Sequence, residues 1–175
     1  MKIVAFAGSN SKNSINKKLA TYVSHLFENA DIEVLDLNDF ALPLFSVDLE
    51  MEIGKPQLAA DFLDKLGSAD IIVLSMAENN GNYSAAFKNL FDWASRQNIK
   101  VFQEKPMLLM ATSDGGRGGA RVLEIAETAF PRYGAIIKAT FSFPKFYDNF
   151  DLEQNKISNP ELDQQIKEIV RNFSI

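Results

Sequence analysis

The sequence predicts an α/β protein in which a parallel sheet of five strands is covered by helices on both faces. Two features of the chain predict this fold. Short apolar runs rich in β-forming residues alternate with segments whose apolar residues recur at helical spacing. The 175 residues contain no repeats, low-complexity tracts or charge blocks, so we expect a single domain over residues 1–175.

The five predicted strands are nearly continuous apolar runs, which is typical of strands buried on both faces of a parallel sheet. They are Lys2–Ala7, Ile32–Leu37, Ile71–Ser75, Met107–Thr112 and Ala135–Phe141. Gly134 is expected to end the connection before the last of them.

The predicted helices are marked by apolar stripes and by residues that favour helix ends. The first carries Ile15, Leu19, Tyr22 and Leu26 on one stripe, and the others cover Pro56–Leu66, Ser84–Arg96, Ala120–Phe130 and the segment from Pro160 onward. Ser84 and Asn159 are the expected N-caps of two of them. Two long connections remain irregular: Asn38–Gly54, which we expect to be a lid or an interface loop, and Ser142–Ile157.

The composition excludes several classes of function. Cys is absent, which excludes disulfides and thiol chemistry, and a single His excludes a multi-His metal site. The net charge of −5 argues against nucleic acid as the main partner. The amino terminus lacks the long apolar region of a signal peptide, and no stretch is suited to cross a bilayer, so we expect a cytoplasmic protein without a membrane partner.

Three polar loops are expected at one edge of the sheet, because ligands of such folds bind beyond the carboxyl ends of the strands. The loop after the first strand, Gly8–Asn16, offers serine hydroxyls and a helix N-terminus that suit a phosphate. The loop Ala77–Ser84 places amide and carboxyl groups around Gly81, and the loop Ser113–Gly119 has four glycines in five positions. Each of the first two loops is also consistent with an ordinary polar turn, and the third with a flexible surface loop. Together the three favour a flat heterocycle with a phosphate tail.

At these motifs the chain resembles the NADPH-dependent FMN reductases, a flavodoxin-like group that includes azo, quinone and chromate reductases. The family pattern G-S-x-R-x-x-S-x-N-x-x-L-A is similar to Gly8–Ala20 here, and P-E-Y-N-x-S-x-P-G-x-L-K-N-x-x-D-W is similar to Ala77–Trp93. Lys105-Pro106 and the loop Ser113–Gly119 match a third signature. The resemblance extends from Met1 to about Phe141.

The resemblance implies a flavodoxin-like three-layer sandwich with strand order 2-1-3-4-5. It implies bound FMN, with NADPH or NADH as hydride donor and a small acceptor such as free flavin, a quinone, an azo compound or a metal oxyanion. It assigns the phosphate to Ser9, Ser11, Ser14 and Asn16, and it includes Ile15 among the residues that bind the cofactor. It assigns the isoalloxazine ring to two sets of residues: Ala77, Glu78, Asn79, Asn80 and Gly81 on one side, and Ser113, Asp114, Gly115, Gly116, Arg117 and Gly118 on the other. No protein nucleophile is needed, because the flavin carries the chemistry.

Three departures from the family pattern leave alternatives open. Ser11 stands where the family has Arg, Asn79 where it has Tyr, and Ser84 where it has Pro. Because Ser11 lacks the positive charge that Arg would place beside the phosphate, we expect weaker FMN binding. The alternatives are a flavodoxin-type electron carrier without NAD(P)H turnover, and a non-catalytic flavin- or phosphate-binding module. The choice between NADPH and NADH also stays open.

Other side chains receive structural interpretations. Glu78 is expected to orient its loop by hydrogen bonding, Lys88 and Asp92 to form an i,i+4 pair, and His25 to lie at the surface. The apolar residues of the helix Ser84–Arg96 cover an arc of roughly 160°, wider than a core stripe. We therefore expect one side of this helix to meet a second subunit in a homodimer or homotetramer. The alternative is that the segment Ser142–Ile157 covers it.

Overall fold

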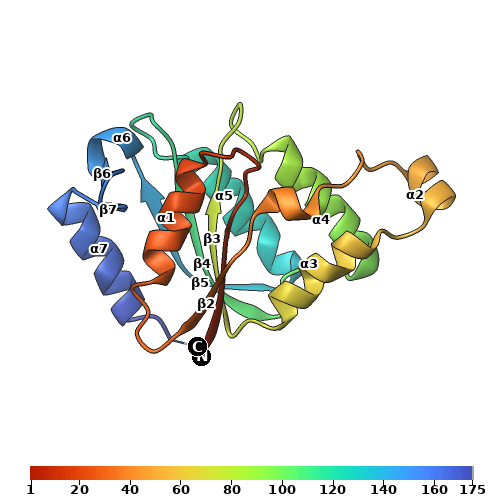
Figure 1. Cartoon of the computed structure of the whole chain (residues 1–175), viewed down its shortest axis with the longest axis horizontal. Coiled ribbons are helices and arrows are strands. Elements are labelled where there is room, and N and C mark those ends of the chain that lie inside the picture. The colour runs from red at the N-terminus through yellow and green to blue at the C-terminus, as the bar shows by residue number, and fades with distance from the viewer. Residues whose placement is uncertain (175) are drawn as a thin grey trace.

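The computed structural model describes residues 1–174 and has three layers, with a parallel sheet between two layers of helices (Figure 1). The strands are β1 (Lys2–Ala7), β2 (Asp31–Val34), β3 (Ile71–Met76), β4 (Lys105–Thr112) and β5 (Ala135–Phe143). They are hydrogen-bonded in the order β2-β1-β3-β4-β5, and every pair in this sheet is parallel. The predicted fold and strand order are confirmed.

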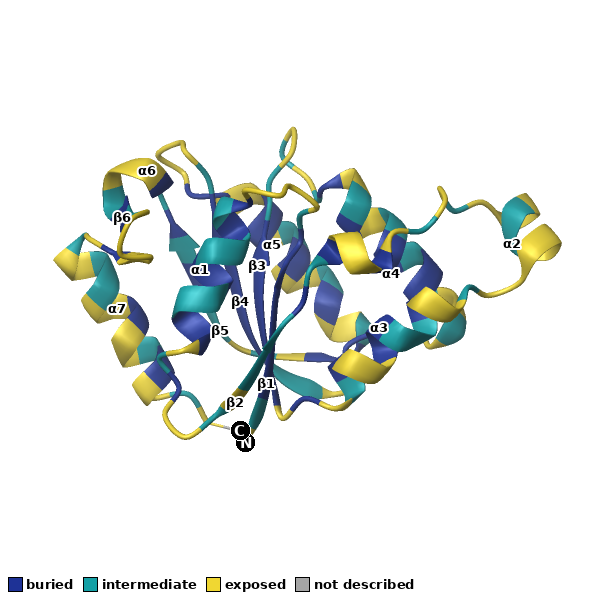
Figure 2. Ribbon diagram, viewed as in Figure 1, coloured by how far each residue is buried: buried dark blue, intermediate teal, exposed yellow. Residues whose placement is uncertain are grey.

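Two groups of helices cover the two faces of the sheet. One face carries α1 (Ile15–Ser24) and α7 (Pro160–Arg171), and the other carries α3 (Gln57–Gly67), α4 (Ala85–Gln97) and α5 (Ala120–Ala129). The remaining elements are η1 (Leu37–Phe40), α2 (Val47–Ile53), η2 (Phe130–Tyr133), α6 (Phe146–Asn149) and the small hairpin of β6 (Phe150–Asp151) and β7 (Lys156–Ile157). Figure 2 shows the sheet and the inward sides of these helices as the buried part of the molecule.

The chain builds one apolar core on each face of the sheet because side chains alternate along a strand. On β1, Ile3 and Ala5 join the core under α1 and α7, whereas Val4 and Phe6 join the core under α3, α4 and α5. All four are fully buried. Such strands are stabilised by apolar burial at roughly 25 cal/mol per Å² and form the rigid platform from which the strand-end loops project.

Most predicted boundaries hold to within two residues, and the end of the second strand differs by three. Ser84 and Asn159 cap α4 and α7 as expected, through bonds from the backbone N–H of Phe87 and of Glu161 and Leu162. The second strand ends at Val34 instead of Leu37, because Asp36 accepts the N–H of Asn38 and starts η1. The fifth strand continues to Phe143, two residues beyond the prediction.

The wide apolar arc of α4 is covered within the chain. Trp93 is fully buried, its indole Nε1 donates to the carbonyl of Pro43 at 2.8 Å, and its ring packs edge-on against Phe45 at 5.0 Å. The helix also packs on α3 and η1. The alternative cover, Ser142–Ile157, packs instead in the core beneath α1 and α7. The arc of α4 therefore gives no evidence for a second subunit.

The segment between η1 and α3 projects from the body as an arm, which we define as residues 43–54. It carries the short helix α2, which has no buried residue and extends far from the sheet at the right of Figures 1 and 2. No helix within residues 1–174 has both the length and the apolar character needed to cross a membrane.

Candidate functional site

The three predicted loops meet at one edge of the sheet around a hollow of about 280 Å³, which we call the strand-end pocket. Its walls come from the carboxyl ends of β1, β3 and β4 and from the segment after β5. The lining residues are Ser9, Ser11, Asn13, Ser14, Ile15, Asn16, Ala77, Glu78, Asn79, Thr112, Ser113, Asp114 and Tyr147. The other predicted residues lie in the same loops outside this lining: Asn80, Gly81, Gly115, Gly116, Arg117 and Gly118.

The loop after β1 presents free backbone donors at the start of α1. Ser14 caps the helix by accepting the N–H of Lys17 at 3.1 Å, and Ser9 Oγ accepts the N–H of Ser11 at 3.2 Å. In the described part of the chain, the N–H groups of Ile15 and Asn16 have no acceptor. Unpaired amides and the positive end of a helix dipole suit a phosphate.

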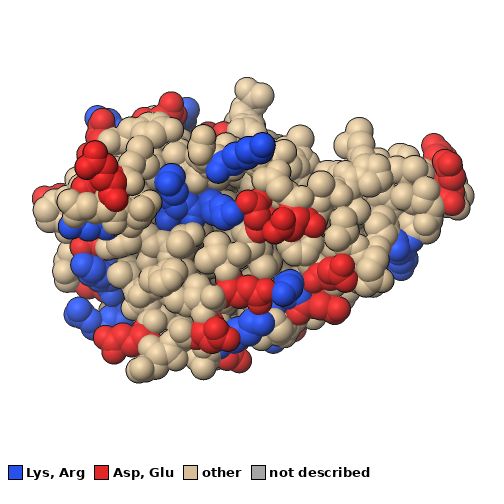
Figure 3. Space-filling view, in the orientation of Figure 1, with Lys and Arg blue, Asp and Glu red and all other residues tan. Residues whose placement is uncertain are grey.

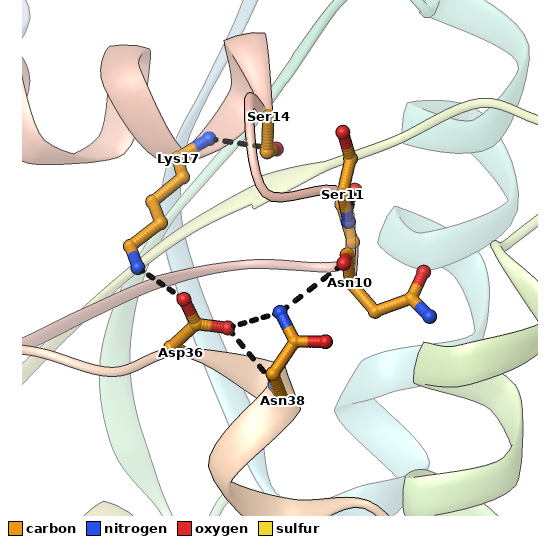
Figure 4. A network of polar contacts seen from close by, with 7 residues as sticks. Asn10, Ser11, Ser14, Lys17, Asp36 and Asn38 are labelled. Carbon is orange, nitrogen blue, oxygen red and sulfur yellow. Dashed lines mark hydrogen bonds and ion pairs between the residues drawn. The ribbon is translucent and has the colours of Figure 1, made fainter.

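A polar network fixes the shape of this loop (Figure 4). Asn38 Nδ2 donates to the carbonyl of Asn10 at 3.1 Å and to Asp36 Oδ1 at 2.7 Å. Lys17 Nζ lies 2.6 Å from Asp36 Oδ2. The hydrogen bond from Lys17, followed by that from the backbone of Asn38, lowers the pKa of Asp36 and keeps it ionised. Lys17 is therefore engaged by Asp36.

Asn16 joins three elements with its side chain. It is 3% exposed, its Oδ1 accepts from the Ser75 hydroxyl at 2.7 Å and from the Thr112 N–H at 3.0 Å, and its Nδ2 donates to the Thr112 carbonyl at 3.1 Å. These bonds tie α1 to the ends of β3 and β4. The side chain of Asn16 therefore has a structural role, and only its backbone N–H has no partner.

The loop after β3 is a tight hairpin that rises above the sheet at the top of Figure 1. Asn79 and Asn82 exchange backbone hydrogen bonds of 2.9 and 3.1 Å, while Asn80 and Gly81 at the tip have φ values of +52° and +74°. Such positive angles belong to a type I′ turn, for which Asn-Gly is the preferred pair. The hairpin places Glu78 and Asn79 in the pocket and carries Asn80 and Gly81 away from it.

Glu78 connects two of the loops. Its Oε2 accepts the N–H of Val122 at 3.0 Å, in the first turn of α5. The N-cap of that helix is Gly119, which has no side chain to supply this bond. The expectation that Glu78 acts by hydrogen bonding is confirmed, and the bond sets the spacing between the loops after β3 and β4.

The glycines of the loop after β4 divide into two pairs. Gly118 and Gly119 have φ values of +54° and +73°, and a Cβ there would lie 2.7 Å from the backbone of Phe143 and 2.8 Å from Ala111 Cβ. The fold itself requires these two glycines. A Cβ at Gly115 or Gly116 would meet no atom closer than 3.8 Å. The space around these two positions therefore does not itself require glycine.

Tyr147 is a residue of the pocket that lies outside all three predicted loops. Its short helix is held to the loop after β4, because the N–H groups of Lys145 and Phe146 donate to the carbonyls of Gly115 and Ser113, both at 3.0 Å. Phe146 is buried and stacks on Phe150, whereas Tyr147 is 62% exposed and lines the pocket. No sequence pattern marked this segment. Asn13 and Thr112 were also missed, although each adjoins a predicted residue.

Two structural interpretations outside the pocket hold. Lys88 Nζ lies 2.7 Å from Asp92, one helical turn away, as the i,i+4 spacing predicted. His25 is exposed, and its Nδ1 lies 2.7 Å from the carbonyl of Thr21.

Fold and site together define a flavodoxin-like α/β protein with a polar pocket at the carboxyl ends of parallel strands, the place where ligands of such folds bind. Comparison with known proteins identifies its family. The chain belongs to the NADPH-dependent FMN reductase family, whose model matches residues 1–148.

Two curated relatives and one solved structure illustrate the likeness. The chain is 34% identical over 125 residues to an NADPH:quinone oxidoreductase of Arabidopsis thaliana, and 31% identical over 122 residues to a quinone reductase of Escherichia coli K12. Each match covers 69% of this chain but only 62% and 64% of the relatives, so the chain spans less than two thirds of their length. The flavoenzyme FerB of Paracoccus denitrificans, an NAD(P)H:(acceptor) oxidoreductase, shares the fold with a TM-score of 0.75 at 23% identity, over 98% of this chain and 94% of that one.

Proposed function

We propose that this protein binds FMN in the strand-end pocket and transfers a hydride from NADPH or NADH to a small acceptor such as a quinone. The observation that carries the proposal is the unpaired pair of amides at Ile15 and Asn16, beside two loops on the same edge of the sheet. A phosphate at the amides would leave a flat ring between those loops. Membership of the family and the names of the relatives support this function.

The residues of the pocket suit the parts of FMN. The hydroxyls of Ser9, Ser11 and Ser14 and the free amides would bind the phosphate. They would do so without a charged partner, because the lining of the pocket includes no Lys or Arg. Loop residues 77–79 and 113–116 would hold the ring. Backbone donors of the second loop would stabilise negative charge on a reduced ring. When bound, FMN supplies the hydride chemistry, and the protein supplies position and electrostatics.

The first experiment is a fluorescence titration with FMN, followed by turnover of NADPH and NADH with a quinone. We expect saturable binding and oxidation of at least one nucleotide. Binding without turnover would instead identify an electron carrier, and a protein that stays colourless with FMN would identify a non-catalytic module.

One substitution tests the phosphate end directly. Ser11→Arg restores the charge that the family pattern has, so FMN should bind roughly fivefold more tightly. Gln165→Arg, exposed on α7, adds the same charge away from the pocket and is the control. Equal effects of the two variants would contradict the phosphate assignment.

We further propose that the protein forms a homodimer or homotetramer through the arm at residues 43–54. Leu44, Val47 and Met51 are 81%, 58% and 73% exposed, and α2 buries no residue against its own chain. Arg96 bonds Glu50 and holds α2 in place. A second copy of this chain would give these apolar side chains a partner. Light scattering should show an oligomer that Val47→Ser/Met51→Ser converts to a monomer, and a monomeric native protein would contradict the proposal.

The cytoplasm is the proposed location because reduced nicotinamide nucleotides, the proposed donors, are available there. Cell fractionation with a tagged chain tests this.

A further inference from the structure

An ion pair joins the first turn of α1 to the segment after β2. The backbone N–H of Lys17 bonds the capping hydroxyl of Ser14 at 3.1 Å, and Lys17 Nζ lies 2.6 Å from Asp36 Oδ2. Figure 4 shows the Lys17 side chain extended toward Asp36 and not toward Ser11. Figure 3 shows basic side chains over α1 next to acidic side chains over η1. An ammonium group from the start of α1 is therefore held by a carboxylate outside the pocket.

Lys17 is placed to reach a phosphate bound at the start of α1. The side chains of a helix tilt toward its N-terminus, so the Lys17 stem begins over the turn that carries the free N–H groups of Ile15 and Asn16. The stem is flexible, and the side chains of Lys17 and Asp36 are 34% and 32% exposed. An ion pair at such exposure contributes little stability, so a phosphate monoester with nearly two negative charges can compete for the ammonium group.

Asp36 is fixed in the position where it meets Lys17. Its Oδ1 accepts the backbone N–H of Asn38 at 2.9 Å and Asn38 Nδ2 at 2.7 Å, which leaves Oδ2 to Lys17. Asn38 Nδ2 also bonds the carbonyl of Asn10 at 3.1 Å, so the carboxylate is tied to the loop before α1. The bond from Lys17, and after it the backbone bond from Asn38, lowers the pKa of Asp36. A fixed negative charge therefore lies next to this loop.

We propose that Asp36 competes with the FMN phosphate for the Lys17 ammonium group and thereby sets a low affinity for the cofactor. The inference rests on the proposed function, which puts the phosphate at the start of α1. Asp36 acts through Lys17, so it is a positioning residue. Ser11 and Asp36 then act in the same direction, because Ser11 lacks a positive charge and Asp36 withholds one. The family pattern leaves position 17 unspecified and does not include position 36.

The decisive experiment compares FMN with riboflavin by fluorescence titration at about pH 8, where a phosphate monoester carries close to two negative charges. The two ligands differ only by the phosphate. Asp36→Asn keeps an acceptor oxygen for Asn38 but removes the charge that holds Lys17. We expect this variant to bind FMN about tenfold more tightly and riboflavin with unchanged affinity. The dissociation rate of FMN should fall by a similar factor.

Three matched variants show whether Lys17 causes the gain. Lys17→Gln/Asp36→Asn should lose the gain. Lys18→Gln/Asp36→Asn should keep it, since Lys18 is the next residue of α1 and has no ion-pair partner within residues 1–174. Glu33→Gln removes a paired carboxylate of β2 and should leave FMN affinity unchanged. A gain that survives the loss of Lys17, or FMN binding in Asp36→Asn no tighter than in the native protein, would overturn the inference.

Inorganic phosphate separates this inference from the proposed function. Titrated by calorimetry into protein without flavin, phosphate should bind more tightly to Asp36→Asn than to the native protein, and the gain should require Lys17. That result in a protein that binds no FMN would support the competition for Lys17 and reject the flavin site. Flavin-dependent turnover, together with a ratio of FMN to riboflavin affinity that Asp36→Asn leaves unchanged, would instead retain the proposed function and overturn the inference.

Discussion

The strand-end loops and the arm at residues 43–54 both connect a strand to a helix, yet they are held very differently. The loops are tied by hydrogen bonds between distant residues: Asn16 bonds Thr112, Ser84 Oγ donates to the Gly8 carbonyl at 2.7 Å, and Glu78 bonds Val122. The arm is tied to α4 at Pro43, Phe45 and Glu50, but its helix α2 has no buried residue. The difference teaches that the chain's own hydrogen bonds hold the strand-end loops, whereas the apolar side chains of Leu44, Val47 and Met51 in the arm are exposed.

The largest effect is expected at Asn16. Asn16→Ala leaves the Ser75 hydroxyl and both backbone groups of Thr112 without partners, so the free energy of unfolding should fall by about 4 kcal/mol. Urea denaturation measures this. Asn13→Ala changes an exposed amide in the same loop and should alter the free energy by less than about 0.5 kcal/mol. A similar loss in both variants would show that the hydrogen bonds of the Asn16 side chain do not hold the loop in place.

The next effect separates the two pairs of glycines. Gly118→Ala forces a Cβ to within 2.7 Å of the Phe143 backbone at a positive φ and should cost about 3 kcal/mol of stability. Gly116→Ala meets no atom within 4 Å and should change stability by less than about 0.5 kcal/mol. The second variant should weaken FMN binding about fivefold, because a methyl group would stand between the loop and the ring. Unchanged FMN affinity in Gly116→Ala would remove this loop from the site.

A smaller effect is expected at the bond between the loops. Glu78→Ala removes the acceptor for the Val122 N–H and should cost about 1 kcal/mol, whereas Glu78→Gln keeps an acceptor oxygen and should recover most of it. Thermal denaturation of the two variants gives the comparison. A loss in Glu78→Gln as large as in Glu78→Ala would mean that charge, and not the hydrogen bond, matters at this position.

Tyr147 should affect the ligand and not the fold. Its ring is exposed, so Tyr147→Ala should leave the unfolding free energy within about 0.5 kcal/mol while weakening FMN binding about fivefold through lost ring contact. Tyr147→Phe should bind FMN like the native protein. Flavin titration and denaturation of the same preparations measure both quantities, and an unchanged affinity in Tyr147→Ala would place the ring outside the contact.

The smallest effect on the isolated chain is expected in the arm. Val47→Ser/Met51→Ser should leave the stability of the monomer within about 0.5 kcal/mol, since neither side chain is buried. Denaturation at protein concentrations too low for association tests this. A substantial loss there would mean that the arm folds against its own chain, as the strand-end loops do.

Prediction from sequence succeeded where the signal is local. Buried strands are visible as apolar runs, and helix starts at Ser84 and Asn159 are visible because a capping side chain bonds the backbone within three residues. The three polar loops were also predicted to share one edge, because parallel strands end together. The boundary of the second strand was missed because Asp36 turns the chain through its own short-range bonds, which compete with strand propensity.

The sequence by itself determined the order of the five sheet strands and the five longer helices, the candidate ligand loops and the membership of a reductase family that its motifs indicated. It did not show the short elements α2, α6, β6 and β7, which lie in the two segments expected to be irregular. Only the tertiary structure decided what each polar residue does. The side chain of Asn16 bonds Thr112, the backbone of Phe143 leaves room only for glycine at position 118, and Tyr147 lines the pocket. Each role depends on a partner that is distant in the chain. The physical reason is that hydrogen bonds and steric contacts depend on separation in space, and spacing along the chain reports that separation only within a helix, a strand or a turn.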